Sequence, residues 1–325
     1  MTVKIGITDG FRLEVDFAME KQFFTEAGFE LKVCNCKSED EIIEQLADCR
    51  IHCTVAGSYS ERVLRALPEL KGIVRYGIGL DTIDVPLATE LGIQVCNEPA
   101  YCVEDVANHA FAMIMDLSRK LTFYTTELRR GNWGFSKGYP AKRMQNRTVG
   151  LVGFGAIARR LKELLTPWNV RFLVYDPFLD EKAIAAAGAE KVEISELMEL
   201  ADIISIHCPL TEETRHLFNR EAFVKMKPQA LLVNTSRGPV IDTLALAQAI
   251  KEGQIYGAAL DVMEQEPISP EHPLCSLSQV VLSPHAAHFS EESFLILRKS
   301  VAAQALQIAR GERPAYLFNK SLWKN

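Results

Sequence analysis

Thr148-Val-Gly-Leu-Val-Gly-Phe-Gly-Ala-Ile-Ala158 is the stretch of sequence that decides the fold. An apolar run leads into a glycine-rich turn and then into the helical pattern of residues 159–165. Gly153 permits a tight turn, Gly155 lets the backbone approach a pyrophosphate, and the small Ala158 lets helix and strand pack closely. Amides at the start of that helix attract phosphates. The stretch therefore predicts a dinucleotide-binding strand, turn and helix.

The next expected strand ends in the acid that such a loop requires. Val174-Tyr-Asp-Pro177 places Asp176 roughly 20 residues after Gly153. A carboxylate there accepts hydrogen bonds from the adenosine ribose and repels a 2′-phosphate. The sequence therefore predicts NAD rather than NADP, with a glycine turn in another kind of α/β protein as the alternative.

Two series of alternating strands and helices flank this loop and predict an α/β protein with two domains. The long helix expected from Val103 to about Arg130 ends at Gly131, and residues 131–143 are a candidate boundary. Six strands in the second series predict a doubly wound Rossmann sheet. The expected strands are 3–8, 31–34, 53–56, 72–76 and 93–96, then 149–152, 172–175, 203–207, 230–234, 257–261 and 280–282; the expected helices include 16–27, 39–48, 60–67 and 291–309.

Composition excludes several functional classes. The 325 residues are 48% hydrophobic and 24% charged with a net charge of −6, so the chain is expected to be globular, with no basic stripe for nucleic acid. No apolar run is long enough for a membrane helix and no export signal precedes Ile7, so a cytoplasmic location is expected. The eight cysteines are expected to be buried thiols, because their spacing does not suit a metal site.

Three polar clusters follow successive strands of the second series. They are Asn234-Thr-Ser-Arg-Gly238, Asp261-Val-Met-Glu-Gln-Glu-Pro267 and Ser283-Pro-His-Ala-Ala287. Alone, Arg237 could be a surface charge, Glu266 a loop acid and His285 a core histidine. Because ligands bind at the carboxyl ends of strands in such sheets, the three together predict a catalytic rim.

The chemistry of these three side chains suits a 2-oxo acid. Arg237 would bind the carboxylate and carbonyl oxygen, and polarise the carbonyl as hydride arrives. His285 would donate a proton to the nascent alkoxide, or accept one in the oxidative direction. Glu266 would orient the imidazole and stabilise its charged form.

With these motifs in place, the sequence resembles the D-isomer-specific 2-hydroxyacid dehydrogenases over nearly its whole length. In that family the matching arginine binds substrate, the matching histidine is the acid/base, and the glutamate pairs with the histidine. Besides the nucleotide loop, the motifs are Arg75-Tyr-Gly-Ile-Gly-Leu-Asp-Thr-Ile-Asp84, Asn97-Glu-Pro99, Val106-Ala-Asn-His109, His207-Cys-Pro-Leu-Thr211, Asn234-Thr-Ser-Arg-Gly238, Leu260-Asp-Val262, Glu266-Pro267 and Pro284-His285.

The resemblance implies a flavodoxin-like substrate domain of residues 1–100, completed by about 295–325, and an NAD-binding Rossmann domain of residues 101–294. It implies a homodimer formed partly by the long helix after Val103. Amides around Ile78 and Gly79 would hold the substrate carboxylate, while Tyr76 would line the pocket or pack in the core. The implied NAD contacts are Gly153, Gly155, Ala156, Ile157, Asp176, Cys208, Pro209, Thr214, Thr235, Ser236, Arg237, Asp261 and His285.

Two alternatives remain beside a reductase of small 2-oxo acids. Phosphoglycerate dehydrogenases of the family tend to carry basic residues where this chain has Gly57-Ser-Tyr-Ser60, although Arg62 and Arg75 are nearby in sequence. The region from Arg75 to Asp84 also resembles corepressors of the C-terminal-binding-protein type, which sense NADH. Against a sensor, no long extension follows Asn325, so an enzyme is expected.

Overall fold

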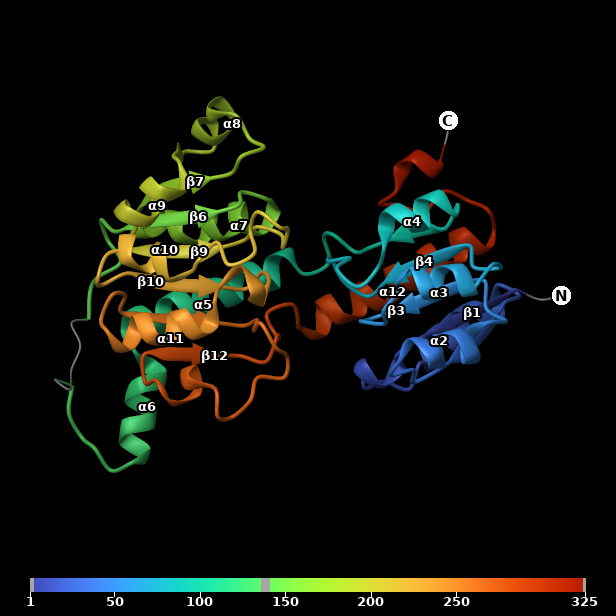
Figure 1. The fold of residues 1–325 in the computed structure, drawn as a ribbon, viewed down its shortest axis with the longest axis horizontal. Coiled ribbons are helices and arrows are strands. Elements are labelled where there is room, and N and C mark those ends of the chain that lie inside the picture. The colour runs from blue at the N-terminus through green and yellow to red at the C-terminus, as the bar shows by residue number, and fades with distance from the viewer. Residues whose placement is uncertain (1–2, 136–140, 324–325) are drawn as a thin grey trace. The chain divides into compact units, whose positions relative to one another are not determined.

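The computed structural model describes residues 3–135 and 141–323 and divides the chain into two α/β units. The first unit contains Met1–Cys102 and Ser290–Asn325, and the second contains Val103–Phe289 (Figure 1). The stretch 131–143, a candidate boundary by sequence, lies inside the second unit, and its residues 136–140 are outside the described ones. Among the described residues, no helix is both long and apolar enough to span a bilayer.

The first unit is a parallel five-stranded sheet in the order β2-β1-β3-β4-β5, the order of a flavodoxin-like sheet, which the resemblance implies for this domain. Its five strands are short and largely buried. They are β1 (Lys4–Ile7), β2 (Glu30–Val33), β3 (Ile51–Thr54), β4 (Gly72–Arg75) and β5 (Gln94–Cys96). Its helices are α1 (Ala18–Glu26), α2 (Glu39–Leu46), α3 (Glu61–Ala66), α4 (Val85–Glu90) and α12 (Glu291–Ala309).

Helices cover both faces of this sheet. On one face, Leu297 and Val301 of α12 pack with Ile7 and Val74 of the strands. The other face has its own cluster, formed by side chains of α2, α3 and α4. The backbone of Leu317 forms an isolated β-bridge with Cys96, so the segment after α12 joins the first unit.

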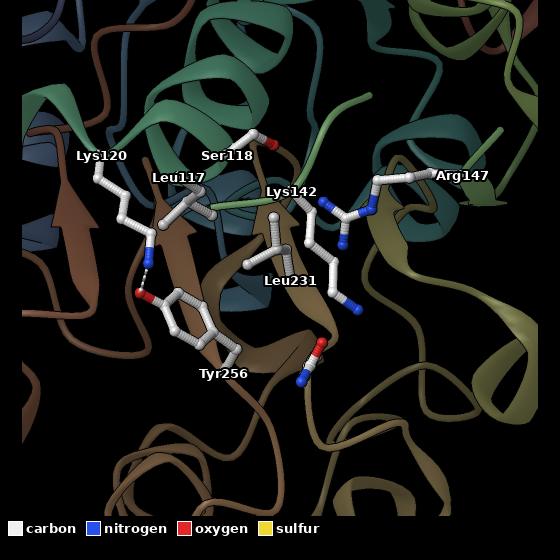
Figure 2. A pocket seen from close by; sticks show the side chains of 8 residues that line it. Leu117, Ser118, Lys120, Lys142, Arg147, Leu231 and Tyr256 are labelled. Atoms are coloured by element: carbon white, nitrogen blue, oxygen red, sulfur yellow. Dashed lines mark hydrogen bonds between the residues drawn. The ribbon is translucent and has the colours of Figure 1, made fainter. Parts of the chain in front are cut away.

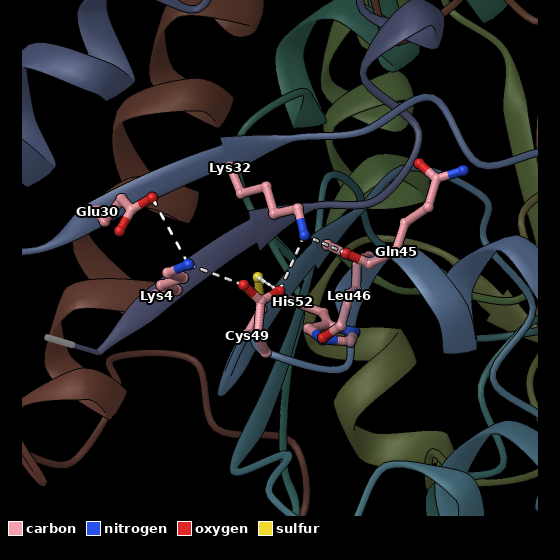
Figure 3. Close-up of polar contacts among 8 residues, drawn as sticks. Lys4, Glu30, Lys32, Gln45, Leu46, Cys49 and His52 are labelled. Atoms are coloured by element: carbon pink, nitrogen blue, oxygen red, sulfur yellow. Dashed lines mark hydrogen bonds and ion pairs between the residues drawn. The ribbon is translucent and has the colours of Figure 1, made fainter. Parts of the chain in front are cut away.

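One cysteine of this unit, Cys49, lies beside a group of polar contacts at the sheet's edge. Asp48 binds both Lys4 and Lys32 at 2.8 and 2.9 Å, beside buried Cys49 and His52 (Figure 3). Burial raises the pKa of the Cys49 thiol to about 12. All eight cysteines of the chain are free thiols, and seven of them are buried.

The second unit is a parallel seven-stranded sheet in the order β12-β11-β10-β9-β6-β7-β8, the doubly wound arrangement of a Rossmann fold. Its central strands β9 and β10 are buried along their whole length because both faces of the sheet are covered. The strands are β6 (Thr148–Val152), β7 (Arg171–Tyr175), β8 (Glu190–Lys191), β9 (Ile203–Ile206), β10 (Leu231–Asn234), β11 (Gly257–Leu260) and β12 (Val280–Leu282). The helices are α5 (Val103–Arg119), α6 (Leu121–Arg129), α7 (Ala156–Leu165), α8 (Glu181–Ala186), α9 (Ile194–Leu200), α10 (Arg220–Lys225) and α11 (Thr243–Lys251).

The single helix expected from Val103 to about Arg130 is wrong, because the helix breaks at Lys120. Lys120 has a left-handed φ of +61°. The Asp116 carboxylate accepts hydrogen bonds from the Thr122 N–H at 2.8 Å and from its hydroxyl at 2.5 Å. Such local side-chain bonds compete with the helical ladder, and α6 starts again in a new direction. Gly131, with φ of +80°, then follows α6 as expected.

Candidate active site

The glycine-rich loop joins β6 to α7 in the second unit. Gly153 has φ of +84°, and its N–H donates to the Tyr175 carbonyl at 2.8 Å. A Cβ at this position would lie 2.9 Å from the backbone nitrogen of Cys208. The turn therefore requires glycine for both its dihedral angle and the close approach of the next loop.

The start of α7 is open where a phosphate would approach. Gly155 caps this helix without a side-chain hydrogen bond, and a Cβ built there has no neighbour within 4 Å. The first amides of the helix, including those of Ala156 and Ile157, lack helical partners. Ala158 is fully buried against the sheet. This geometry fits a dinucleotide pyrophosphate.

The ends of β7 and β10 carry polar atoms that fit the rest of NAD. The two carboxylate oxygens of Asp176 each accept one backbone N–H, from Phe154 and Phe178 at 2.9 Å, and both retain lone pairs for ribose hydroxyls. The Thr235 hydroxyl is enclosed and has no hydrogen-bond partner among the described residues. A buried hydroxyl without a partner is costly, so a bound ligand would satisfy it.

The remaining expected NAD contacts lie in loops of the same unit. Cys208 is buried, and burial raises the pKa of its thiol to about 11. The Thr214 hydroxyl donates to the Pro209 carbonyl at 2.7 Å, and the Ser236 hydroxyl donates to Asn234 Oδ1 at 2.9 Å. Their contacts with the cofactor stay predictions.

His285 and Glu266 lie together, as the sequence predicts. His285 Nδ1 is 2.8 Å from Glu266 Oε2, and the Met263 N–H donates to Glu266 Oε1 at 3.0 Å. Burial opposes ionisation of Glu266, but these hydrogen bonds and the charges of His285 and Arg237 lower its pKa below the usual value. The carboxylate is therefore ionised at neutral pH.

Arg237 follows β10 on the same side of the sheet. Its Nη1 donates to the Ser236 carbonyl at 2.7 Å, and its own carbonyl accepts from Asn234 Nδ2 at 2.9 Å. A Cβ on Gly238 would lie 1.8 Å from the Met263 carbonyl oxygen. Glycine at 238 thus lets the loop that carries the arginine pack against the loop that leads to Glu266.

Asp261 has a structural task that the sequence did not reveal. Its carboxylate accepts hydrogen bonds from the Ser283 hydroxyl at 2.5 Å and from the N–H groups of Ala286 and Ala287 at 2.9 Å. The His285 N–H donates to the Asp261 carbonyl at 2.7 Å. His109 Nε2 lies 2.9 Å from the Ser283 hydroxyl. Asp261 therefore fixes the histidine loop; its expected contact with the nicotinamide stays a prediction.

Three of the expected substrate residues, Tyr76, Ile78 and Gly79, belong to the first unit. Tyr76 is 4% exposed in the core, which favours its packing role. Ile78 and Gly79 lie in the loop after β4, and neither N–H has an acceptor among the described residues. The Asn97 side chain donates to the Ile78 carbonyl at 2.7 Å. Asn97 thus supports this loop, a role its motif gave no reason to expect.

The second unit is a doubly wound domain with an open glycine-rich loop. An acid, a histidine and an arginine lie beyond the ends of its strands. Together these features define an NAD-dependent oxidoreductase. The family described as D-isomer specific 2-hydroxyacid dehydrogenase, NAD binding domain, matches residues 111–287. This chain belongs to the D-isomer specific 2-hydroxyacid dehydrogenases.

Individual relatives cover most of the chain. A glyoxylate reductase of Korarchaeum cryptofilum is 39% identical over 88% of each chain. A D-3-phosphoglycerate dehydrogenase of Methanocaldococcus jannaschii is 34% identical over 98% of this chain and 59% of its own. The D-lactate dehydrogenase structure from Escherichia coli is similar with a TM-score of 0.81 and 29% identity, and covers 97% of this chain and 100% of that one.

Proposed function

We propose that this enzyme reduces a small, unphosphorylated 2-oxo acid to the 2-hydroxy acid, with glyoxylate as the first candidate. The observation that carries the proposal is the 2.8 Å hydrogen bond between His285 and an ionised Glu266, within reach of the Arg237 charge. Similarity to proteins named glyoxylate reductase supports the choice of substrate.

Each of the three side chains has one task in this proposal. Bound NADH supplies the hydride. Arg237 binds the substrate carboxylate and polarises its carbonyl. Because Glu266 occupies Nδ1, the Nε2 atom of His285 is the one that donates a proton to the carbonyl oxygen. Glu266 stabilises the imidazolium before transfer, and in the oxidative direction the neutral imidazole accepts the proton.

The loop of residues 57–60 supports an unphosphorylated substrate. Tyr59 is fully buried, and its hydroxyl lies 2.8 Å from that of Thr8. Arg62 is bound to the carboxylates of Asp40 and Glu39. Both side chains have partners within the protein, which favours a substrate without a phosphate group over that of a phosphoglycerate dehydrogenase.

A homodimer in the cytoplasm is part of the same proposal. Apolar side chains at and after α6 are exposed in the single chain: Leu121 is 63%, Leu128 51%, Trp133 91% and Phe135 87% exposed. A second copy would cover such a surface. The free thiols suit a reducing compartment.

The test is NADH oxidation with a panel of 2-oxo acids: glyoxylate, pyruvate, hydroxypyruvate, phenylpyruvate and phosphohydroxypyruvate. We expect turnover of glyoxylate or hydroxypyruvate, and a loss of about a thousandfold in kcat in His285→Ala. His216→Ala is the matched control, because His216 makes a similar pair with Glu264 at 2.7 Å. Its kcat should stay within about twofold of the parent.

Two results would contradict the proposal. A preference for phosphohydroxypyruvate would favour the phosphoglycerate dehydrogenase. Tight NADH binding with no turnover of any acid would favour the sensor.

A further inference from the structure

A pocket lies at the amino-terminal ends of strands in the second sheet. The cofactor is expected at the carboxyl ends of these strands, on the opposite edge. Its walls come from the end of α5, from the residue before β6, and from the starts of β10 and β11 (Figure 2). The polar side chains that matter for its chemistry are Lys120, Lys142, Arg147, Gln229 and Tyr256.

Positive charge gathers in this pocket. Three of its lining side chains are cationic, and no Asp or Glu is among the described residues that line it. Lys120 is 5% exposed, and burial lowers its pKa to about 8. Its ammonium donates to the Tyr256 hydroxyl at 2.7 Å (Figure 2). Lys120 also has a left-handed backbone with φ of +61°, a conformation that costs energy in a residue other than glycine.

Besides the concentration of positive charge, an unpaired N–H of Arg147 also indicates a ligand. It is 92% buried, since its exposed fraction is 8%, and its Nε has no acceptor among the described residues. Its Nη2 donates to the Asp202 carbonyl at 3.2 Å. The Asp202 carboxylate itself binds Lys227 and the Thr148 N–H, both at 2.9 Å. A buried guanidinium N–H without an acceptor is costly, and an anion would supply one.

The pocket is separate from the NAD site. Arg147 directly precedes β6, whereas Gly153 directly follows this five-residue strand. At about 3.3 Å per residue, the two ends of β6 are roughly 15 Å apart. An anion in the pocket would therefore not compete with the cofactor's pyrophosphate.

We propose that Lys120, Lys142 and Arg147 form a binding site for a small multivalent oxyanion of the phosphate or pyrophosphate type. The fork of Arg147 matches two oxygens of one phosphate group, and the two ammonium groups neutralise the remaining charge. The Tyr256 hydroxyl and the Gln229 amide supply neutral donors at the rim. The site belongs to the second unit alone and does not depend on the identity of the 2-oxo acid.

The test is calorimetric titration of the full chain with sodium pyrophosphate and, separately, with sodium phosphate. Saturating NADH fills the glycine-rich loop, and sodium chloride keeps the ionic strength constant. We expect one saturable site per chain, with tighter binding of pyrophosphate. Lys142 is exposed, so Lys142→Ala should fold and bind NADH normally while its Kd for pyrophosphate rises about tenfold, and Lys142→Glu should raise it further.

Lys182→Ala is the matched control, because Lys182 is an exposed lysine on α8. It removes the same charge from the same unit, and its Kd for pyrophosphate should equal that of the parent. The proposal is overturned if the NADH-saturated parent shows no saturable binding at constant ionic strength. It is also overturned if the Lys142 variants bind as tightly as the parent, or if Lys182→Ala weakens binding equally.

Discussion

Glu266 shows how one carboxylate can stay charged although it is partly buried. Hydrogen bonds from His285 and from the Met263 N–H outweigh the cost of burial and lower its pKa. Removing its charge should therefore affect proton transfer and leave the fold intact. In Glu266→Gln we expect kcat to fall about a hundredfold while the Kd for NADH stays within about threefold. Stopped-flow kinetics and NADH fluorescence measure the two quantities, and an unchanged kcat would remove Glu266 from the mechanism.

Glu98 is the opposite case, a carboxylate that burial keeps partly protonated. It is 2% exposed, accepts a hydrogen bond from Gln304, and has a pKa raised by burial to about 7. The folded state thus holds a proton that the unfolded chain releases above its ordinary pKa of 4.5. The stability from this group is present below pH 4.5 and is lost as the pH rises through 7.

Glu98→Gln should remove this pH dependence. At pH 8 we expect the variant to be more stable than the parent by up to about 3 kcal/mol, because the uncharged amide avoids the buried charge. At pH 4.5 the two proteins should differ by less than about 1 kcal/mol. Urea unfolding at both pH values gives the comparison, and an equal difference at both would assign the effect to packing.

At the scale of elements, a substitution between β6 and α7 should weaken cofactor binding without destabilising the fold. The open space at Gly155 means that a methyl group there meets no protein atom. Gly155→Ala should therefore cost less than about 1 kcal/mol of stability, as an alanine at a helix cap does. The methyl group would occupy the space of the pyrophosphate, so the Kd for NADH should rise at least about tenfold.

Gly134→Ala is the matched control for this prediction. Gly134 also has no neighbour within 4 Å of its Cβ position, and it lies outside the loop. Its NADH affinity and its Tm should equal those of the parent. Thermal unfolding and fluorescence titration of both variants suffice, and unchanged NADH affinity in Gly155→Ala would mean that the pyrophosphate lies elsewhere.

The sequence predicts elements well where periodicity is long and uninterrupted. Helix α12 has the predicted bounds, and each predicted strand matches an observed one to within a few residues. Helix α4, with six residues, and strand β8, with two, are too short to show a period. The helix breaks at Lys120 because the Asp116 carboxylate accepts a hydrogen bond from the backbone N–H of Thr122. Periodicity does not reveal such a contact.

The sequence likewise predicts one part of the candidate site and not the other. Arg237, Glu266 and His285 could be predicted because each follows a strand, and carboxyl ends of parallel strands share one edge. The contacts of Asp261 with Ser283 and the histidine loop could not be predicted, since they depend on distances between segments far apart in the chain. The same is true of the orphaned Nε of Arg147.

At the scale of the whole molecule, acid should weaken the two units unequally. His52 in the first unit and His207 in the second are buried, and burial lowers the pKa of each to about 4. The unfolded chain takes up these protons below its ordinary pKa of 6.5, so stability is lost as the pH falls from 6.5 to 4. At pH 5, each buried histidine lowers the free energy of unfolding by roughly 2 kcal/mol.

In the first unit, Glu98 offsets this loss. As the pH falls from 7.5 to 5, protonation of the Glu98 carboxyl raises the free energy of unfolding by roughly 2 kcal/mol. Among the described groups with a shifted pKa in the second unit, none offsets the loss from His207 in this way. Hydrogen exchange should show weaker protection at pH 5 in β9 and nearly constant protection in β3, after correction for intrinsic rates. Equal losses in both strands would contradict this.

The first unit takes its strands from the beginning of the chain and its longest helix from the end. During synthesis on the ribosome, β1 to β5 emerge early, but one face of their sheet is covered only in part, by α1, until α12 arrives. The second unit has all of its residues once the nascent chain has passed Phe289. The unit that is first in sequence is therefore the last to be completed, and when the second unit has left the ribosome the first still needs the segment that follows it to cover its sheet.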